Sequence, residues 1–520
     1  MKQNIIILLL LFVNSSFLFS QTQQKIKWPS LADSPWPVLN GDMQGTGRSD
    51  YVGPTSSNPY IHWMADLPLG IFWGPTLGYD DILYFGSYAL DSDLENHFYA
   101  YFPDGNPYWI FNTSTGYPNN FSPLITKDSS VYMKSNDGVL YCLTHNGNLK
   151  WTSYVGFGGM RMHFSLDLDG NIYAFSQDTL RILNSQGIEI QLKYIKDISS
   201  PVIFSPDGGT IYFKTGHKTN WEQDHSLVAA DLEGNIVWRY WFFETNEAPV
   251  TVDNQGNIYC YGTDSTNGIK HFIYSFTENG EIRWKYPTDG YFTFNSVTVD
   301  IEGNILFYCR KDNGSTNYIV SLKNNGELNW EVRLKPDENP YFAQVNHGLT
   351  SDANGNIYFG SRDGVNFYAM NKYGEFLWTL SLNGYGYFSS PAIGSDGTLY
   401  IGTSLSTFFQ NHQNNLIAIN DEPLYTADDN KPIISLELAQ NYPNPFNFLT
   451  KIEYSVENPD WIKLNVYNFL GEFITTLVDE YKSRGMYNIN FNAENLASGI
   501  YFYTIISGTN FETKKMVLLR

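Results

Sequence analysis

The sequence predicts an all-β protein, in which an eight-bladed β-propeller is followed by a small immunoglobulin-like (Ig-like) β-sandwich. Three observations predict this fold. A four-strand unit recurs through the middle of the chain, one further unit is split between the two ends of that region, and the pattern changes near residue 430. Aromatic residues make up 17% of the chain, which suits sheets that pack face to face.

The recurring unit is clearest between Val250 and Trp284, where four short apolar or alternating runs are separated by tight turns and one longer loop. The turns at residues 253–257 (Asp-Asn-Gln-Gly-Asn) and 278–281 (Glu-Asn-Gly-Glu) contain Gly and Asn, which accept the positive φ of short hairpins. Four strands linked in this way form one small antiparallel sheet. Such a sheet needs neighbours to cover its faces.

A Gly followed four residues later by a Trp marks the last turn and last strand of each unit. The pairs are Gly105/Trp109, Gly147/Trp151, Gly234/Trp238, Gly280/Trp284, Gly326/Trp330 and Gly374/Trp378. One spacing is double, and the unit inside it has residues 169–173 and Gly187, with Gln191 in place of Trp. A period of this length is typical of a repeat architecture, in which each Trp gives the next sheet a flat apolar surface.

The ring is expected to close on itself. The last unit has only three predicted strands (residues 390–393, 397–401 and 415–419) and lacks an outer strand near residue 424. An orphan strand at residues 60–63 precedes the first unit. If it completes the last sheet, the ring has eight blades over residues 60–420 and leaves no open edge at its closure.

The N-terminus is predicted to direct secretion. Residues 1–20 have the pattern of a signal peptide, with Lys2, an apolar core at residues 5–13 and an expected cleavage after Ser20. The core is too short to span a bilayer, and no later stretch is apolar enough, so we expect no membrane span. Residues 21–59 are predicted to be an irregular lead-in.

The net charge of −21 argues against nucleic acid or anionic lipid as a partner, because both attract cationic surfaces. Cys142, Cys260 and Cys309 lie far apart, each inside a strand pattern. This placement favours small buried hydrophobic residues over a disulfide or a metal site, so no metal ligand is assigned.

The lead-in contains Trp36-Pro37 and a Thr46-Gly47-Arg48 turn. Together with the repeats, this opening resembles the pyrroloquinoline-quinone-like (PQQ-like) propeller family over residues 34–420. The resemblance implies the fold. It is poorly specific for activity, because the family includes dehydrogenases, assembly scaffolds and uncharacterised surface proteins.

Residues 421–432 are acidic and end at a proline, which is typical of a linker. Residues 433–520 then alternate with a period of two in six or seven short runs separated by Gly-containing turns, and they predict the β-sandwich. The expected strands cover residues 452–456, 462–467, 472–477, 487–491, 499–505 and 514–518.

This C-terminal part resembles the sorting domain (type A) of the type IX secretion system. The matching stretches are residues 438–447 (Leu-Ala-Gln-Asn-Tyr-Pro-Asn-Pro-Phe-Asn), 466–471, 496–503 and 512–520. Phe448 departs from the family, which usually has Pro there. The sorting residues that the resemblance implies are Asn441, Pro443, Pro445, Gly471, Gly499, Tyr501, Lys514 and Lys515.

The resemblance implies that the type IX secretion machinery is a partner. It implies a protein that is secreted, or attached to the outer-membrane surface, in a bacterium of the Bacteroidetes–Chlorobi kind. Removal of the domain after export would release or attach the protein.

A ligand is expected on the face that carries the loops between second and third strands and between blades. Aromatic residues precede several channel-lining strands, where they could stack on sugars or grip a peptide. Packing between blades explains the same pattern and is the simpler interpretation. The candidate ligand-binding residues are Trp73, Tyr117, Tyr154, His217, Trp221, Trp241, Tyr291, Tyr341, Tyr385 and Tyr387.

The loop at residues 214–226 combines His217, Trp221, Glu222, Asp224 and His225, which could form a ligand or metal pocket, although a solvated polar loop is the simpler interpretation. Residues 87–97 and 403–415 are weaker cases. Residues 167–171 and 253–257 superficially resemble calcium loops. They lack the Glu at the twelfth position, so we interpret them as hairpin turns.

These observations favour a binding scaffold for a glycan or protein ligand, with no catalytic residue and no cofactor assigned. The alternative is a quinone-dependent dehydrogenase or a polysaccharide-active enzyme that uses the loop face. By resemblance, a quinone enzyme commonly has an adjacent cysteine pair, which this sequence lacks. The sequence also has no Gly-x-Ser-x-Gly elbow, His-Glu-x-x-His motif or phosphate loop.

Overall fold

The computed structural model describes residues 22–519 with gaps. The gaps are residues 68–69, 72, 88–96, 114–120, 158–163, 177, 217–224, 246–247, 266–268, 290–295, 312–315, 335–347, 362–365, 383–386, 405–413, 422–436, 457–459, 483–484, 495 and 509. The described chain is all-β, as predicted, and its one helix is the short 3₁₀ turn η1 (Tyr79–Asp81).

Seven four-stranded antiparallel sheets occupy the described residues between 76 and 381, each built from four strands that are consecutive in sequence. The first four contain β2 (Thr76–Leu77), β3 (Leu83–Gly86), β4 (His97–Tyr101), β5 (Pro107–Asn112); β6 (Leu124–Ile125), β7 (Val131–Lys134), β8 (Val139–Leu143), β9 (Leu149–Tyr154); β10 (Phe164–Leu166), β11 (Ile172–Ser176), β12 (Thr179–Leu183), β13 (Glu189–Tyr194); β14 (Ile203–Phe204), β15 (Thr210–Thr215), β16 (Ser226–Asp231), β17 (Ile236–Trp241).

The next three sheets repeat the same order. They contain β18 (Thr251–Val252), β19 (Ile258–Asp264), β20 (Lys270–Phe276), β21 (Ile282–Thr288); β22 (Thr298–Val299), β23 (Ile305–Lys311), β24 (Thr316–Leu322), β25 (Leu328–Leu334); β26 (Thr350–Ser351), β27 (Ile357–Gly360), β28 (Asn366–Met370), β29 (Phe376–Ser381). The predicted strands of the unit at residues 250–284 are therefore confirmed.

A further sheet joins the two ends of this region. It contains β30 (Tyr387–Phe388), β31 (Ala392–Ile393), β32 (Leu399–Ser404), β33 (Asn414–Asn420) and the distant β1 (Tyr60–Leu67). Strand β1 pairs with β33 in antiparallel register, with Tyr60 opposite Asn420 and Ile61 opposite Ile419. The prediction that residues 60–63 lie alongside residues 415–419 is confirmed.

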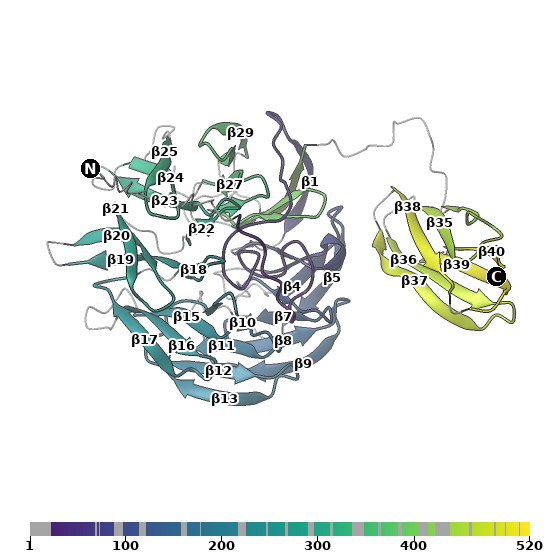
Figure 1. The fold of residues 1–520 in the computed structure, drawn as a ribbon, viewed down its shortest axis with the longest axis horizontal. Coiled ribbons are helices and arrows are strands. Elements are labelled where there is room, and N and C mark those ends of the chain that lie inside the picture. Colours follow the sequence, from purple (N-terminus) through teal and green to yellow (C-terminus); the bar gives the residue numbers. More distant parts are fainter. Residues whose placement is uncertain are drawn as a thin grey trace, which may run out of the picture.

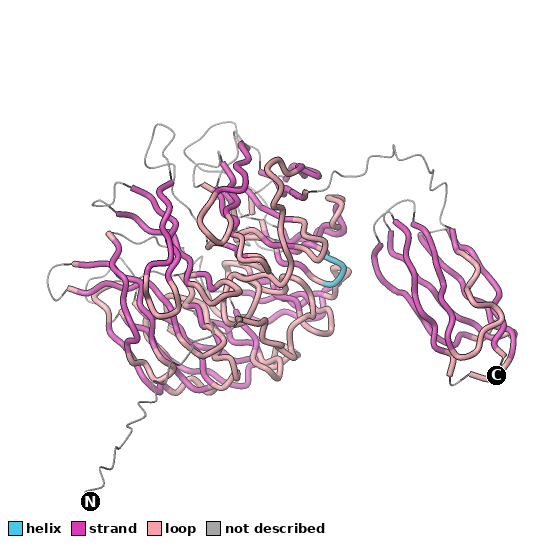
Figure 2. Tube along the Cα trace, turned by 45° about the horizontal axis from the view of Figure 1, so that its top comes forward, coloured by secondary structure: helices cyan, strands magenta, loops and turns pink. Residues whose placement is uncertain are grey.

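The sheets are arranged around a common centre in a propeller-like ring, and the purple N-terminal segment coils in the middle (Figure 1). The first strand of each four-stranded sheet is buried throughout, as in β18 and β22, whereas the fourth strand is largely exposed, as in β9 and β25. The first strands therefore line the centre and the fourth strands form the rim. In the tilted view, the described part of the ring consists of strands (magenta) and loops (pink), with η1 as a short cyan turn (Figure 2).

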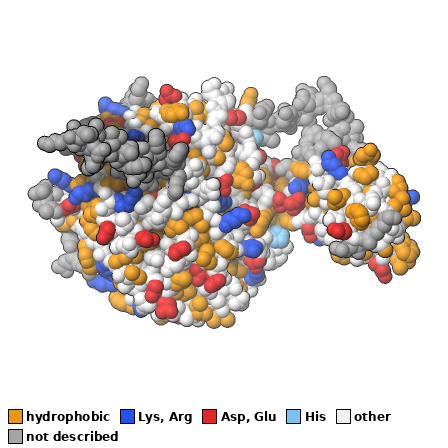
Figure 3. Space-filling model, viewed as in Figure 1, with side chains coloured by type: hydrophobic (Ala, Val, Ile, Leu, Met, Phe, Trp, Pro, Cys, Tyr) orange, Lys and Arg blue, Asp and Glu red, His pale blue; other side chains and the backbone are white. Residues whose placement is uncertain are grey.

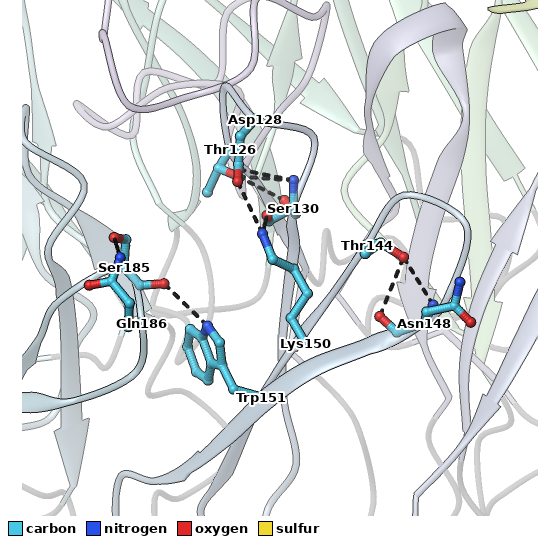
Figure 4. Close-up of polar contacts among 9 residues, drawn as sticks. All are labelled: Thr126, Asp128, Ser130, Thr144, Asn148, Lys150, Trp151, Ser185 and Gln186. Atoms are coloured by element: carbon cyan, nitrogen blue, oxygen red, sulfur yellow. Dashed lines mark hydrogen bonds and ion pairs between the residues drawn. The ribbon is translucent and has the colours of Figure 1, made fainter.

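The Gly and Trp of the repeat form one contact between neighbouring sheets. The indole N–H of Trp151 donates to the Ser185 carbonyl of the following sheet at 3.2 Å (Figure 4). Other repeat Trp residues do the same at 2.7–2.8 Å, toward the carbonyls of Pro103, His145, Glu278, Asn324, Lys372 and Pro54. In the sheet without a Trp, the Gln191 side-chain amide donates to the Glu233 carbonyl at 3.2 Å. Gln191 therefore keeps the hydrogen bond to the next sheet but lacks the indole ring.

The constant four-residue spacing between Gly and Trp in each unit follows from this contact. Gly280 has φ +82°, and a Cβ there would lie 2.7 Å from the indole of Trp238 in the preceding sheet. Glycine is required for both reasons, because other residues rarely adopt positive φ and none would leave room for the ring.

The C-terminal part forms two sheets, as a sandwich requires. One contains β34 (Glu437–Leu438), β35 (Leu449–Val456) and β38 (Gly485–Asn492), and the other contains β37 (Phe473–Lys482), β36 (Asp460–Asn468), β39 (Gly499–Ser507) and β40 (Asn510–Leu518) in that spatial order. Their shared core includes the fully buried Ile452, Leu464, Tyr503 and Met516. The six predicted strands are confirmed, and the short β34 was not predicted.

Candidate functional site

Much of the predicted loop-face site lies outside the described residues. This applies to Tyr117, His217, Trp221, Tyr291, Tyr341 and Tyr385, and to most of the loops at residues 87–97, 214–226 and 403–415. Of Tyr387 the structure gives the backbone, which belongs to β30.

The remaining candidate aromatics are not brought together. Trp73 is 5% exposed and belongs to the buried part of the ring, whereas Tyr154 and Trp241 are 56% and 54% exposed. Tyr154 ends β9 and Trp241 ends β17, and both strands are fourth strands. These two side chains therefore lie on the rim of two different sheets. The Arg239 guanidinium lies 4.9 Å from the centre of the Trp241 ring.

Some aromatics of the same pattern pack between sheets. Phe242 is buried, and its ring occupies the space over Gly262, where a Cβ would lie 2.4 Å from it. Phe388 covers Gly360 in the same way at 2.5 Å. For these two residues the packing interpretation is confirmed.

The centre of the ring is occupied by residues 36–49, which we call the axial segment. Its carbonyl groups accept hydrogen bonds from backbone N–H groups of six first strands, so one short stretch contacts most of the ring. The donor–acceptor pairs, at 2.8–3.0 Å, are Leu77–Trp36, Ile125–Pro37, Phe204–Met43, Val252–Gln44, Val299–Thr46 and Ser351–Gly47. Each donor is the second residue of its strand, so the axial segment lies at the end where the first tight turns begin.

The axial segment carries a buried pair of opposite charges. Asp42 and Arg48 are each 6% exposed. Asp42 accepts hydrogen bonds from the backbone and hydroxyl of Thr46, and Arg48 donates to the carbonyls of Val299 and Gln24. Burial raises the pKa of Asp42, an effect that Arg48 opposes, and burial lowers the pKa of Arg48. The Trp-Pro and Thr-Gly-Arg motifs therefore build the centre of the ring.

The Asp-x-x-Gly-Asn stretches are hairpin turns, as predicted. One carboxylate oxygen of Asp253 accepts the N–H groups of Gln255 and Asn257 at 2.9 Å, and the other accepts the Asn257 amide at 2.8 Å. Asp167, Asp300 and Asp352 repeat this pattern. Within the described ranges, no three His, Cys, Asp or Glu side chains are placed to hold a metal ion together.

Cys142, Cys260 and Cys309 are buried, as predicted, in three separate sheets. Burial raises the pKa of these thiols to about 11, about 12 and about 12 respectively. Neutral thiols of this kind are poor nucleophiles and poor metal ligands, which agrees with a packing role.

Two buried lysines were missed by the sequence analysis. Lys134 and Lys214 hold the same place in β7 and β15, two residues beyond Tyr132 and Tyr212, which pair with the first strand. Burial lowers the pKa of each amine to about 7. Lys134 lies 4.9 Å from the centre of the Phe121 ring and donates to the Phe175 carbonyl at 3.4 Å. The sequence did contain a signal for these two residues, which is a Lys inside an otherwise apolar second strand of the sheet.

The sorting residues around the two prolines form a hydrogen-bonded loop. Asn441 is 1% exposed; its backbone N–H donates to the Tyr503 hydroxyl at 2.7 Å, and its amide donates to the Pro443 carbonyl at 3.1 Å. The peptide bonds before Pro443 and Pro445 are cis. Phe448 has φ +62°, which a proline ring does not permit, so the departure from the family sequence coincides with a different backbone conformation.

The other sorting residues lie at strand ends and on the last strand. Gly471, with φ +79°, forms the turn between β36 and β37, and no atom lies within 4 Å of a Cβ built there. Tyr501 donates to the Ala497 carbonyl at 2.8 Å and closes the entry to β39, which begins at Gly499. Lys514 and Lys515 belong to β40, and Lys514 pairs with Glu512 at 2.9 Å.

Several solved structures are similar to this chain. The C-terminal WD40 domain of Sif2 shares 13% identity at a TM-score of 0.47, covering 71% of this chain and 99% of that one. A streptogramin B lyase shares 13% identity at a TM-score of 0.43, covering 71% of this chain and 100% of that one. PorZ is a surface component of the type IX secretion system of Porphyromonas gingivalis. It shares 9% identity at a TM-score of 0.25, covering 89% of this chain and 82% of that one. The curated proteins contain no match.

No helix among the described residues is long and apolar enough to cross a membrane. Residues 440–519 match the family described as "Secretion system C-terminal sorting domain", which covers the predicted sorting residues from Asn441 to Lys515. A type IX sorting domain marks proteins that this machinery exports to the cell surface or the extracellular space. The chain therefore ends in a type IX sorting domain, and the protein is cargo exported to the cell surface or beyond.

Proposed function

We propose that the protein is a binding scaffold outside the cell, built as an eight-bladed PQQ-like propeller with an Ig-like sorting domain. Residues 1–20 are its signal peptide and residues 421–432 its linker. The observation that carries the proposal is the exported ring itself, whose centre is occupied by its own axial segment. With that end of the centre occupied, the loop face and the rim are the surfaces left for a partner.

The rim supports a glycan ligand. Tyr154 and Trp241 expose more than half of their side chains, and Arg239 adds a cation over the Trp241 ring. Flat aromatic faces with neighbouring donors stack on sugar rings. The loop-face residues named from the sequence would extend this surface, with a protein ligand as the alternative.

A glycan array with the purified full-length protein tests the proposal. We expect binding to at least one envelope or host glycan, weakened at least tenfold by Trp241→Ala or Tyr154→Ala. Tyr373→Ala is the matched control, because Tyr373 is 68% exposed but lies in the turn before β29. The absence of binding to every glycan on the array would exclude a glycan ligand. An equal loss of binding in all three variants would exclude the rim site.

The enzymatic alternative is tested on the same protein. Pyrroloquinoline quinone with calcium is added while the visible spectrum and the melting temperature are recorded. A binding scaffold shows neither a cofactor band nor a thermal shift. Both signals together would overturn the proposal in favour of a quinone enzyme.

A further inference from the structure

Among the residues that the structure describes, the sorting domain contacts the ring at three places, of which the first is an aromatic stack. The rings of Phe102 and Tyr481 are stacked with centroids 3.8 Å apart and planes 10° from parallel. The Tyr481 hydroxyl donates to the Asp104 carboxylate at 3.0 Å. Phe102 and Asp104 belong to the turn between β4 and β5, and Tyr481 is near the end of β37 and only 4% exposed.

Trp461 of β36 makes the second contact. Its ring stacks beside His145 at 5.3 Å and 21°, and beside Tyr108 at 6.5 Å and 15°. Its indole N–H donates to Asp479 within the sorting domain at 2.7 Å. Trp461 also packs against the core cluster shared by the first two sheets of the ring, so the contact is apolar as well as aromatic.

The third contact brings two carboxyl groups together around a cavity of about 310 Å³. Asp80 at the tip of the β2–β3 turn faces Glu480 of β37. Burial, together with the charge and hydrogen bond of Glu480, raises the pKa of Asp80 to about 7. The cavity walls include Tyr79, Asp80, His145, Trp461, Asp479 and Glu480. Acidic side chains (red) lie beside the junction of the two parts (Figure 3).

Other charged and titratable groups around Asp80 modify this pairing. Lys482 lowers the pKa of Asp80, and it also pairs with Glu480 at 2.6 Å. Asp81 raises the pKa of Asp80. Burial, together with the charge of Asp80, raises the pKa of Tyr84 of β3 and of Tyr454 of β35, which lie on either side of the junction. Asp80 has φ +57°, a conformation that non-glycine residues rarely hold and that is often found at functional sites.

The orientation of the contact leaves three of the sorting residues, Gly471, Lys514 and Lys515, away from the ring. The four-stranded sheet runs in the order β37–β36–β39–β40, and the contacts come from the end of the β36–β37 hairpin that holds Trp461 and Tyr481. Gly471 lies at the other end of that hairpin. Lys514 and Lys515 lie on β40, at the opposite edge of the sheet.

We propose that the ring docks its own sorting domain through the ends of β36 and β37, that this dock holds Gly471, Lys514 and Lys515 away from the ring, and that a proton between Asp80 and Glu480 controls it. The proposal concerns the regulation of the sorting domain. It does not depend on which ligand the ring binds.

The direction of the pH effect follows from linkage. Undocking removes Glu480 and part of the burial, so Asp80 binds its proton more weakly in the undocked state. Docking is therefore strongest in acid, below the pKa of undocked Asp80. It weakens by up to about tenfold per pH unit as the pH rises toward about 7, where docked Asp80 also ionises.

Small-angle X-ray scattering on the full chain without residues 1–20 tests this proposal. We expect a compact particle at pH 5.5 and a larger maximum dimension at pH 8.5. Asp80→Asn should stay compact at both values, because an amide can face Glu480 without repulsion. Tyr481→Ala should be extended at both.

Phe469→Ala is the matched control, since Phe469 is a 68% exposed aromatic residue at the far end of the same hairpin, and it should behave as wild type. Wild-type dimensions equal to those of Tyr481→Ala at both pH values would overturn the dock. A pH response that persists in both Asp80→Asn and Glu480→Gln would overturn the role of the proton. Neither result would affect the glycan array, so the two proposals fail separately.

Discussion

At the scale of single residues, the ring is held by one repeated contact. Five of the repeat Trp residues lie over the glycine of the following sheet and donate the indole N–H to a carbonyl in the turn beside it, whereas Trp378 donates to the Pro54 carbonyl of the lead-in. For Trp284, the glycine is Gly326 and the acceptor is the Asn324 carbonyl at 2.8 Å. Since the last turn of each sheet meets the Trp of the preceding one, the four-residue spacing in the sequence reflects a contact between neighbours.

Trp284→Ala is expected to lower the free energy of unfolding by about 3 kcal/mol, because it removes a large, partly buried ring together with its hydrogen bond. Gln191→Ala is the matched control. It should cost only about 1 kcal/mol, the typical net value of one hydrogen bond, since that position has no ring to lose. Urea unfolding of the full chain measures both. Equal losses of unfolding free energy in the two variants would show that the indole ring contributes little.

Residue identity was predictable where one chemical requirement repeats. The Gly and Trp positions and the Asp-x-x-Gly-Asn turns recur in sheet after sheet, so sequence alone showed their roles. Lys134 and Lys214 were missed because a buried Lys at this place occurs in only two of the sheets, and a strand pattern does not tell which end of the strand reaches the interior. Asp80 was missed for a similar reason: its environment includes Glu480, which is 400 residues away in the sequence.

At the scale of elements, the axial segment joins sheets that share no strand. Its carbonyl groups satisfy buried N–H groups of six first strands, which would otherwise lack acceptors at considerable cost. The sequence predicted an irregular lead-in but not its path through the centre, because a chain without periodicity gives no indication of which surfaces it covers. The strands and their order, by contrast, followed from period-two alternation and turn residues.

Arg48→Ala is expected to destabilise the ring by about 3 kcal/mol, because it removes charge-assisted hydrogen bonds to the Val299 and Gln24 carbonyls and the nearby charge that opposes the raised pKa of Asp42. The sign of the pH effect also follows. Without Arg48, the pKa of Asp42 rises further, so the folded state binds a proton more tightly than the unfolded state. Stability of the variant should then be highest in mild acid and fall as the pH rises through that pKa.

Urea unfolding at pH 5 and pH 8 measures this difference, with wild type as reference. Asp42→Asn combined with Arg48→Ala is the control, since it lacks the titrating group and should lose the added pH dependence. A pH response of Arg48→Ala identical to that of the double variant would contradict the role assigned to the pair.

At the scale of the whole molecule, the ring and the sorting domain are separate parts. The C-terminal domain has its own buried core, and the family match is confined to it. The ring has its own closure and its own centre. The sequence predicted this division because the hydrophobic pattern changes near residue 430, but it could not predict that the two parts touch, since the contacting residues are ordinary turn and strand-end residues.

Deletion of residues 437–520 is expected to keep the protein inside the cell, because the sorting domain is what the type IX machinery recognises. Cell fractionation with antibodies against the ring measures the distribution. Tyr481→Ala, which disrupts the dock but keeps the sorting residues, should still be exported. Export of the truncated protein at the wild-type level would contradict the role of the domain.

The central claim is that the chain forms a closed ring whose last sheet is completed by its first strand. The most direct test is a disulfide between Tyr60→Cys and Asn420→Cys, which face each other in the register of β1 and β33. Opposite residues of an antiparallel pair lie about 4.5–5.5 Å apart, within the range that a disulfide spans. We predict that oxidation links residues 60 and 420, as detected by mass spectrometry, whereas Tyr60→Cys with Ile110→Cys on β5 stays unlinked. A reduced 60–420 pair in the folded, oxidised protein, or equal linkage in both variants, would contradict the closed ring.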